Sequence, residues 1–148
     1  TFLNRIHLGS LVYLGTALKR LFLNPLYEMD VWLDGNEPLH FQKVYFAAAM
    51  NQPYEGGGFR FCPDAKTDDG LLDVIVVSDL PRLKVLCLLP TAFVGKHVHF
   101  KGIHIYKCKK VRFEVNEKAA VHMDGQPSAV GSTLEAEIAK TQIKVIVP

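Results

Sequence analysis

The stretch LLDVIVV, residues 71–77, decides the fold, because six of its seven side chains are apolar. A strand without polar alternation is typical of one that is buried on both faces of a sheet. The single exception is Asp73, whose carboxylate needs a partner or a cation to be tolerated inside such a strand. The sequence therefore predicts a buried strand that carries one acidic side chain.

Two β-like runs precede this strand. They are EMDVWLD at residues 28–34 and LHFQKVYFAAAM at residues 39–50. Gly35 and Asn36 lie between them, and both residue types tolerate the positive φ angles that tight turns require. We therefore expect the two runs to pair as a hairpin.

A helix and more strands follow the buried strand. Residues 81–94 predict a helix that begins at Pro81 and that Pro90 must break or kink. Apolar and polar residues then alternate in several runs, which predicts further strands at residues 103–108, 110–117, 119–125 and 133–147. Strands at this spacing predict a mainly β fold, either a β-sandwich or a distorted barrel, with one short internal helix.

The first part of the chain has a helical pattern. Apolar residues recur at helical spacing through residues 2–23, which predicts an N-terminal amphipathic helix that ends before Pro25. Charged residues, among them Arg5 and Lys19, interrupt its apolar run. The uncharged stretch is therefore well short of the roughly twenty residues that a membrane-spanning helix needs.

Composition limits the classes of function. The chain has 148 residues, of which 49% are apolar and 22% charged, as expected of one globular domain. Its formal net charge of +2 is too small to imply nucleic-acid binding. Basic side chains do gather around one expected hairpin, either as a solvated strand pair or as a membrane-facing patch; they are Lys101, Lys107, Lys109, Lys110, Arg112 and Lys118.

The cysteines and histidines give weak signals. Cys62, Cys87 and Cys108 are widely spaced and contain no C-x-x-C pair, which favours reduced thiols over a disulfide framework or a zinc site. His97 and His99 would point to the same side of a strand, but no third ligand lies at a suitable spacing. We therefore expect no metal role for these two histidines.

The run Gly56, Gly57 and Gly58 lacks the spacing of either common phosphate-binding glycine motif. Glycines in a row permit unusual φ angles and the close approach of another backbone or a ligand. A loop that packs on its own sheet and a loop that contacts a ligand both fit this run.

Aspartates crowd the segment between the glycines and the buried strand; they are Asp64, Asp68, Asp69 and Asp73. Asp68-Asp69-Gly70 alone is typical of a turn that leads into a strand. Asp73, however, lies inside the apolar run, and oxygen ligands of this type suit Mg²⁺ or Ca²⁺. A second acidic spot, Asp124-Gly125, is by composition a hairpin turn.

Taken together, these pieces resemble a known family. They are Asn51 followed by the glycines at 56–58, PDAKTDDGLLDVIVV at 63–77, GKH at 95–97 and HMDGQP at 122–127, in the same order and separation. The chain is similar over essentially its whole length to the C-terminal domain of the soluble lipid kinases that include bacterial diacylglycerol kinases and sphingosine kinases. In that family the domain is a β-sandwich that carries part of the active site.

The resemblance implies a two-domain enzyme, of which residues 1–148 form the C-terminal β-sandwich domain. The family's nucleotide-binding motif, G-G-D-G-T, belongs to a preceding domain and does not occur in these residues. The implied reaction is transfer of the γ-phosphoryl group of ATP to a lipid hydroxyl, which depends mainly on positioning and on charge neutralisation by Mg²⁺. A peripheral location on the cytoplasmic side of a membrane follows from the same resemblance, and the lipid could be diacylglycerol or a sphingoid base.

The resemblance also assigns site residues. Asp124 stands in the family's D-G-E motif and would assist the acceptor hydroxyl as a base or by organising charge. Asp69 and Asp73 resemble the acidic loop that supports a structural Mg²⁺. Asn51 and the three glycines would line the cleft between the two domains.

One letter departs from the family pattern. The third position of D-G-E is Gln126 here, and a neutral amide can donate and accept hydrogen bonds but cannot take a proton at neutral pH. If the family's Glu is the base, this chain has lost it; if the Asp is the base, the change is mild. The alternative function is a non-catalytic β-sandwich module, from a degenerate kinase, that binds a lipid or a protein.

Overall fold

The computed structural model describes residues 19, 23, 25–55, 58–124 and 126–141. Within them the elements follow in the order β1 (Tyr27–Leu33), β2 (Leu39–Val44), β3 (Phe46–Met50), β4 (Leu72–Val77), α2 (Arg82–Ala92), η3 (Lys96–His99), β5 (Ile103–Cys108), β6 (Lys110–Met123) and β7 (Gln126–Glu137). The N-terminal helix predicted over residues 2–23 lies outside the described residues, apart from two positions.

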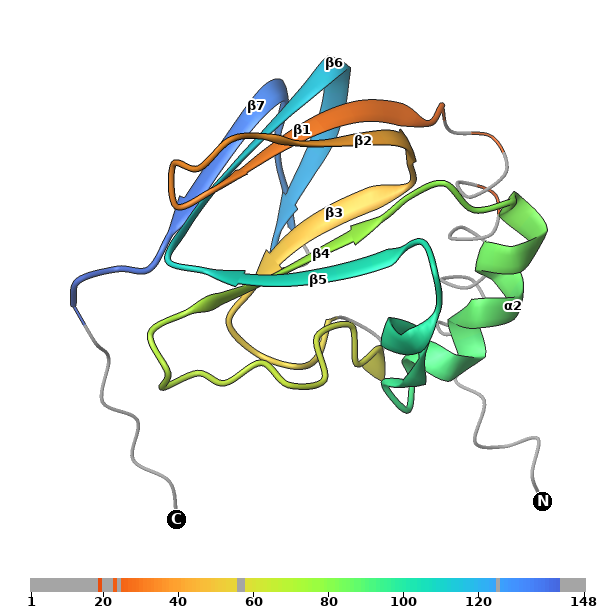
Figure 1. Ribbon diagram of the computed structural model, residues 1–148, viewed down its shortest axis with the longest axis horizontal. Helices are drawn as coiled ribbons and strands as arrows, with labels where there is room; N and C mark the ends of the chain where they lie inside the picture. The colour runs from red at the N-terminus through yellow and green to blue at the C-terminus, as the bar shows by residue number, and fades with distance from the viewer. Residues whose placement is uncertain (1–18, 20–22, 24, 56–57, 125, 142–148) are drawn as a thin grey trace.

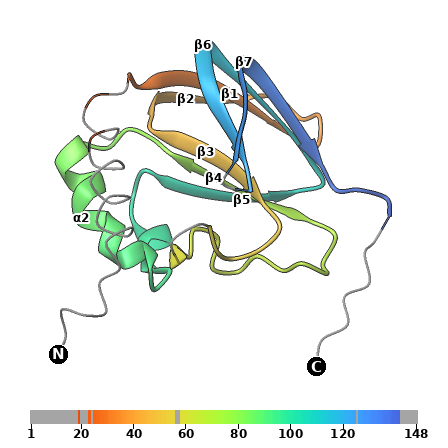
Figure 2. The same ribbon diagram turned by 180° about the vertical axis from the view of Figure 1, so that it is seen from behind.

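The strands form two antiparallel sheets (Figure 1). One has four strands in the order β2-β1-β6-β7, and the other has three strands in the order β3-β4-β5. The sheets stack face to face, and α2 lies on the far side of the three-stranded sheet (Figure 2). The predicted β-sandwich is confirmed, and the described strands do not close into a barrel.

The buried strand is β4, the middle strand of the three-stranded sheet, and all six of its residues are buried. Successive side chains of a strand point to opposite faces. Val74 and Val76 therefore pack between the two sheets, in a cluster with Val31 and Phe113. Ile75 and Val77 pack on the other face, against α2. The prediction of a strand covered on both faces is confirmed.

The predicted first hairpin is formed by β1 and β2, which pair antiparallel from Tyr27 to Val31. Its turn places Asp34 and Gly35 at positive φ angles of 54° and 76°. The Asn36 N–H then donates to the Leu33 carbonyl at 3.1 Å. The hairpin therefore forms where predicted, with the left-handed positions one residue earlier than Gly35-Asn36.

The run at residues 39–50 is two strands and not one. The chain leaves the four-stranded sheet after Val44 and enters the three-stranded sheet at Phe46. Lys43 has a positive φ of 49° at this step, and the Tyr45 N–H donates to the Val77 carbonyl at 2.8 Å. The Tyr45 hydroxyl donates to the Leu80 carbonyl at 2.6 Å, so this corner is fixed on both sides.

Later in the chain the sequence predicts two strands, at 110–117 and 119–125. The structure instead has one continuous strand over most of this range, β6. Its pairing with β7 shifts register between Glu114 and Ala119. The prediction that the basic side chains gather around one hairpin is also wrong. β5 pairs with β4, whereas β6 pairs with β1 and β7. The lysines of β5 and β6 thus belong to different sheets.

The predicted helix at 81–94 is confirmed as α2, which begins after Pro81. Pro90 lies inside it, and the helix continues for only two residues beyond. Gly95, with a φ of 73°, then turns the chain into η3, where a strand containing His97 and His99 was expected. No helix in the described part of the chain is long and apolar enough to cross a membrane.

Candidate functional site

The acidic loop before β4 is folded by its own side chains. The Leu71 N–H donates to Asp69 Oδ1 at 3.0 Å, which closes a turn around Gly70. Gly70 has a φ of 70°, a conformation that glycine adopts without strain. The predicted strand-entry turn is confirmed, and it directs the other carboxylate oxygen of Asp69 towards β5, where Lys107 lies.

Lys107 is the partner of Asp73, a pairing that the sequence does not reveal. It pairs with Asp73 across the β4–β5 ladder. Its Nζ lies 3.3 Å from Asp73 Oδ2 and 3.3 Å from Asp69 Oδ2. The same ammonium donates to the Asp64 carbonyl oxygen at 3.3 Å. Three oxygen atoms from three separate positions therefore converge on one cation, which supplies the partner that Asp73 requires.

Burial and charge act in opposite directions at this cluster. Burial raises the pKa of Asp73, and the Lys107 ammonium lowers it in part. The pKa of Asp69 is held below its usual value by the Leu71 N–H and by Lys107. Burial lowers the pKa of Lys107, but hydrogen bonds to the two carboxylates outweigh this effect and raise it overall. The cluster therefore holds an ammonium ion at neutral pH.

The donor set is suited to an oxygen-coordinated cation. Mg²⁺ and Ca²⁺ prefer carboxylate and carbonyl oxygens, and Asp69, Asp73 and the Asp64 carbonyl offer only these. Asp73 Oδ1, which is buried, has no hydrogen-bond partner among the described residues, and Asp73 Oδ2 has only the ion pair with Lys107 Nζ at 3.3 Å. However, no group of three or more His, Cys, Asp or Glu side chains in the described part could hold a metal. A metal here would need carbonyl or water ligands and would compete with Lys107.

Asp124 lies at the turn of the β6–β7 hairpin. Met123 pairs with Gln126, so Asp124 and Gly125 form the two-residue connection that the Asp-Gly pair predicts, although Gly125 lies outside the described residues. Asp124 has a positive φ of 49°, as such turns require. Asp124 and Gln126 are both exposed, as are nearly all the described side chains of this half of the hairpin.

The glycine loop follows β3 and returns to the body of the domain before β4. Asn51 is exposed directly after Met50. Glu55 and Phe59 form an isolated antiparallel bridge, and the Gly58 N–H donates to the Glu55 carbonyl at 3.3 Å. Gly58 has a φ of 85° and open space where a Cβ would lie, so its backbone conformation, and not close packing, calls for glycine. Gly56 and Gly57 lie outside the described residues.

The GKH segment has a structural role in this domain. A Cβ on Gly95 would lie 2.8 Å from Pro63 Cγ, so only glycine fits there. His97 is 3% exposed, and its Nε2 lies 3.0 Å from the Phe61 carbonyl oxygen. Burial lowers the pKa of His97, which favours the neutral ring. This segment therefore fastens η3 to the loop at residues 59–65.

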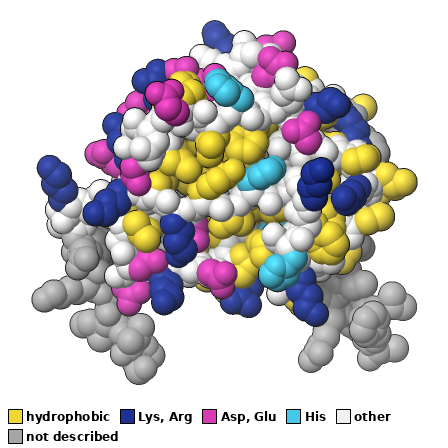
Figure 3. Space-filling view, in the orientation of Figure 1, with side chains coloured by type: hydrophobic (Ala, Val, Ile, Leu, Met, Phe, Trp, Pro, Cys, Tyr) yellow, Lys and Arg dark blue, Asp and Glu magenta, His cyan; other side chains and the backbone are white. Residues whose placement is uncertain are grey.

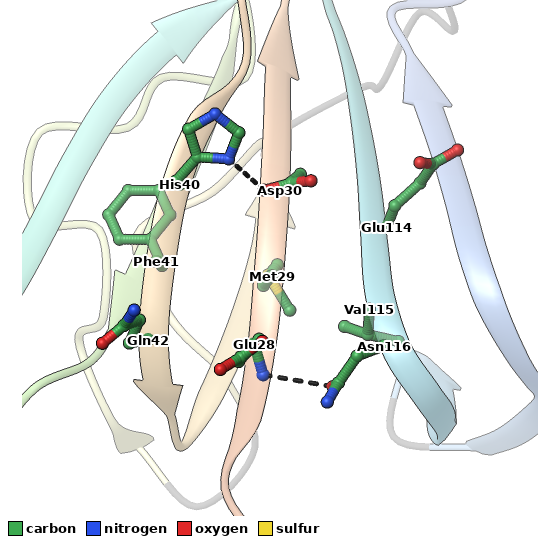
Figure 4. Close-up of a pocket in the computed structure, with 9 residues that line it drawn as sticks. All are labelled: Glu28, Met29, Asp30, His40, Phe41, Gln42, Glu114, Val115 and Asn116. Atoms are coloured by element: carbon green, nitrogen blue, oxygen red, sulfur yellow. Dashed lines mark hydrogen bonds and ion pairs between the residues drawn. The ribbon is translucent and has the colours of Figure 1, made fainter.

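A groove of about 430 Å³ lies on the outer face of the four-stranded sheet (Figure 4). In it His40 Nδ1 lies 2.5 Å from Asp30 Oδ1, and Asn116 Oδ1 accepts a hydrogen bond from the Glu28 N–H at 3.2 Å. None of the predicted site residues lines it. The sequence does not predict this groove, because β1, β2 and β6 supply its residues and no local motif links them.

The two stacked sheets, with α2 packed on the outer side of the three-stranded sheet, define a β-sandwich domain. The chain belongs to the family described as the YegS C-terminal NAD kinase beta sandwich-like domain, whose model matches residues 3–147. The family predicted from the sequence motifs is thereby confirmed.

Relatives and solved structures agree with this membership. The chain is 33% identical over 91 residues to the Bacillus subtilis protein named "Putative lipid kinase YtlR", covering 62% of this chain and 29% of that protein. It is 37% identical over 82 residues to a diacylglycerol kinase of Mycobacterium tuberculosis, covering 55% of this chain and 26% of the relative.

A crystal structure described as a "putative diacylglycerol kinase" from Bacillus anthracis shares the fold, with a TM-score of 0.65 and 21% identity. The match covers 84% of this chain and 41% of that one. The chain therefore spans less than half the length of each of these three proteins.

Proposed function

We propose that this chain is the second domain of an ATP-dependent lipid kinase that transfers the γ-phosphoryl group to a lipid hydroxyl. The observation that carries the proposal is the family match over residues 3–147, together with relatives that are named as lipid and diacylglycerol kinases. The remainder of the enzyme would supply the nucleotide-binding motif, and the lipid would be diacylglycerol or a similar alcohol.

Asp124 is the residue that we propose for the active site. Its exposed position on a two-residue turn would let it reach into a cleft formed with a preceding domain. There its carboxylate would accept the proton of the lipid hydroxyl or organise charge around it. Gln126, the next described residue, would hydrogen-bond the nucleotide or the lipid head group. Asn51 and the glycines at 56–58 would line the same cleft.

Mg²⁺ would neutralise the charge of the transferred phosphoryl group and support the acidic loop. Asp69 and Asp73 would hold it, because their oxygens already converge on a cation. Lys107 would then have to leave its present position. In the absence of the metal, the same lysine prevents repulsion between the two carboxylates.

The test is ATP-dependent lipid phosphorylation by the intact protein that contains this chain, with and without Asp124→Asn. We expect a loss in kcat of roughly a hundredfold or more, typical of removing a positioned base. Asp79→Asn is the matched control, because Asp79 is also an exposed aspartate with a positive φ, of 53°. Full turnover by Asp124→Asn would show that the site is misassigned.

One observation favours a second candidate, a non-catalytic module that binds a lipid or a protein. Gln126 stands where the family has glutamate, so a base in that position is absent from this chain. An intact protein that phosphorylates no lipid under any condition, yet binds lipid vesicles, would support this second candidate over the kinase.

A further inference from the structure

Charge is distributed very unevenly along this chain. No acidic residue occurs between Leu80 and Phe113, although the whole chain has a formal charge of only +2. That segment covers α2, η3, β5 and the start of β6. It carries eight basic side chains: Arg82, Lys84, Lys96, Lys101, Lys107, Lys109, Lys110 and Arg112. Positive charge is therefore concentrated in one part of the fold.

Only some of these basic groups are available to a partner. Lys107 is paired with Asp69 and Asp73, and both Lys110 and Arg112 are paired with Glu135. The four remaining lysines form no ion pair with a described acidic residue, and all are exposed: Lys84 in α2, Lys96 in η3, Lys101 after η3 and Lys109 between β5 and β6. Three of these four lysines thus lie in or directly after α2 and η3.

The outer face of α2 is apolar where a helix at a protein surface is normally polar. The buried face is formed by Val85, Leu88 and Ala92. The opposite face repeats at helical spacing and is exposed along its whole length, from Leu83 through Cys87 and Pro90 to Val94. Leu83 is 68% exposed and Val94 is 60% exposed. Exposing a contiguous apolar face of this kind to water is unfavourable, so such a face often marks a binding surface.

Aromatic side chains extend this face. Phe93 and Phe100, which follow α2 and η3, are 49% and 40% exposed. The Phe93 ring stacks on Phe59 with centroids 4.3 Å apart, so it is anchored to the body of the domain. In Figure 3, hydrophobic and basic side chains lie side by side over α2 and η3, on the right of the view. Apolar groups flanked by lysines are the pattern of surfaces that lie in the headgroup region of anionic bilayers.

We propose that the outer face of α2, with η3, binds the surface of an anionic phospholipid bilayer. Leu83, Phe93, Val94 and Phe100 would enter the boundary between headgroups and acyl chains, and Lys84, Lys96 and Lys101 would contact lipid phosphates. This inference deepens the proposed function, since a lipid kinase must reach a substrate held in a membrane. Binding can be measured without ATP, so it is tested independently of catalysis.

The experiment is flotation of the intact protein with phosphatidylcholine vesicles, with and without phosphatidylglycerol, in the absence of ATP. Each lysine near an anionic surface contributes a factor of about five, so Lys96→Gln with Lys101→Gln should weaken binding about thirtyfold. Leu83→Ser with Val94→Ser should weaken it by at least tenfold through lost apolar burial. The matched control is Lys118→Gln with Lys140→Gln, two exposed lysines outside this face, and it should bind like the unsubstituted protein.

Three results would overturn the proposal. The first is unchanged vesicle binding by the Lys96 and Lys101 variant, and the second is an equal loss in the control. The third is a lower melting temperature of the Leu83 and Val94 variant with unchanged vesicle binding, because this face would then pack against protein. An intact protein that floats with vesicles but transfers no phosphate would contradict the proposed kinase and support the bilayer surface.

Discussion

Replacing Lys107 by methionine removes the ammonium that holds the acidic cluster together. Its Nζ lies 3.3 Å from the carboxylate of Asp73, a side chain that is 1% exposed. Two unit charges at that distance attract by about 5 kcal/mol at an effective dielectric constant of about 20. The Lys107 side chain is 39% exposed, and an unpaired Asp73 can take up a proton. Both effects reduce the expected loss of unfolding free energy to about 2–3 kcal/mol.

This loss should depend on pH in a defined direction. Burial raises the pKa of Asp73 in the folded chain, and the variant lacks the ammonium that partly opposes this rise. The folded variant therefore binds the Asp73 proton more tightly than the unfolded chain does. Its deficit is then largest above the raised pKa and shrinks as the pH falls through that pKa.

The assay is urea unfolding of residues 1–148, followed by circular dichroism and by Trp32 fluorescence. At neutral pH the midpoint should fall by about 1 M, since a domain of this size loses about 1–3 kcal/mol per molar urea. Adding Asp73→Asn should recover most of the loss, because a neutral amide does not need the cation. A deficit that does not shrink as the pH is lowered stepwise from 8 into the acid range, or a double variant no more stable than Lys107→Met, would refute this account.

Three further predictions concern the proposed metal ligands, Gln126 and Gly102. Asp69→Asn and Asp73→Asn should each raise the Mg²⁺ concentration required for half-maximal activity of the intact protein, and an unchanged requirement in both would exclude them as ligands. Gln126→Glu should retain or increase kcat, whereas a loss of more than tenfold would show that the amide itself is needed. Gly102→Ala should lower the unfolding free energy by about 1–3 kcal/mol, because Gly102 has a φ of 92° and a Cβ there would lie 2.6 Å from Leu80 Cγ. Thermal melting measures this loss, and an unchanged melting temperature of Gly102→Ala would disprove the steric argument.

The parts of the fold that the sequence predicted have local causes. The buried strand β4 was visible because its burial on both faces removes polar alternation. The turn at Asp124 is predictable because Asp-Gly is a common turn pair, and Asp124 has the positive φ that such turns require. In contrast, the separation of β2 from β3 at Tyr45 has no glycine or proline to mark it. The tertiary position of the strand, fixed by hydrogen bonds to β4 and to Leu80, determines that corner.

In the candidate site, too, features with a local cause can be predicted from the sequence, whereas contacts between distant segments cannot. Asp73 was recognised as unusual because a lone carboxylate interrupts an apolar strand. Its partner Lys107 could not be identified, since β4 and β5 are brought together by pairing between distant segments. The His97 and His99 pair was misread as part of a strand, although the preceding Gly95 is a common end signal for a helix. Its left-handed conformation converts the segment to η3 and buries only one of the two rings.

Transfer of the labelled γ-phosphate of ATP to lipid vesicles tests the central claim most directly. The vesicles should contain both diacylglycerol and a sphingoid base, and the assay should compare residues 1–148 alone with the intact protein. We expect the intact protein to label a lipid and residues 1–148 to fold cooperatively but label nothing, because positioning both reactants requires the nucleotide-binding part as well. Lipid phosphorylation by residues 1–148 alone would contradict the two-domain account, and no labelling by the intact protein would contradict the kinase.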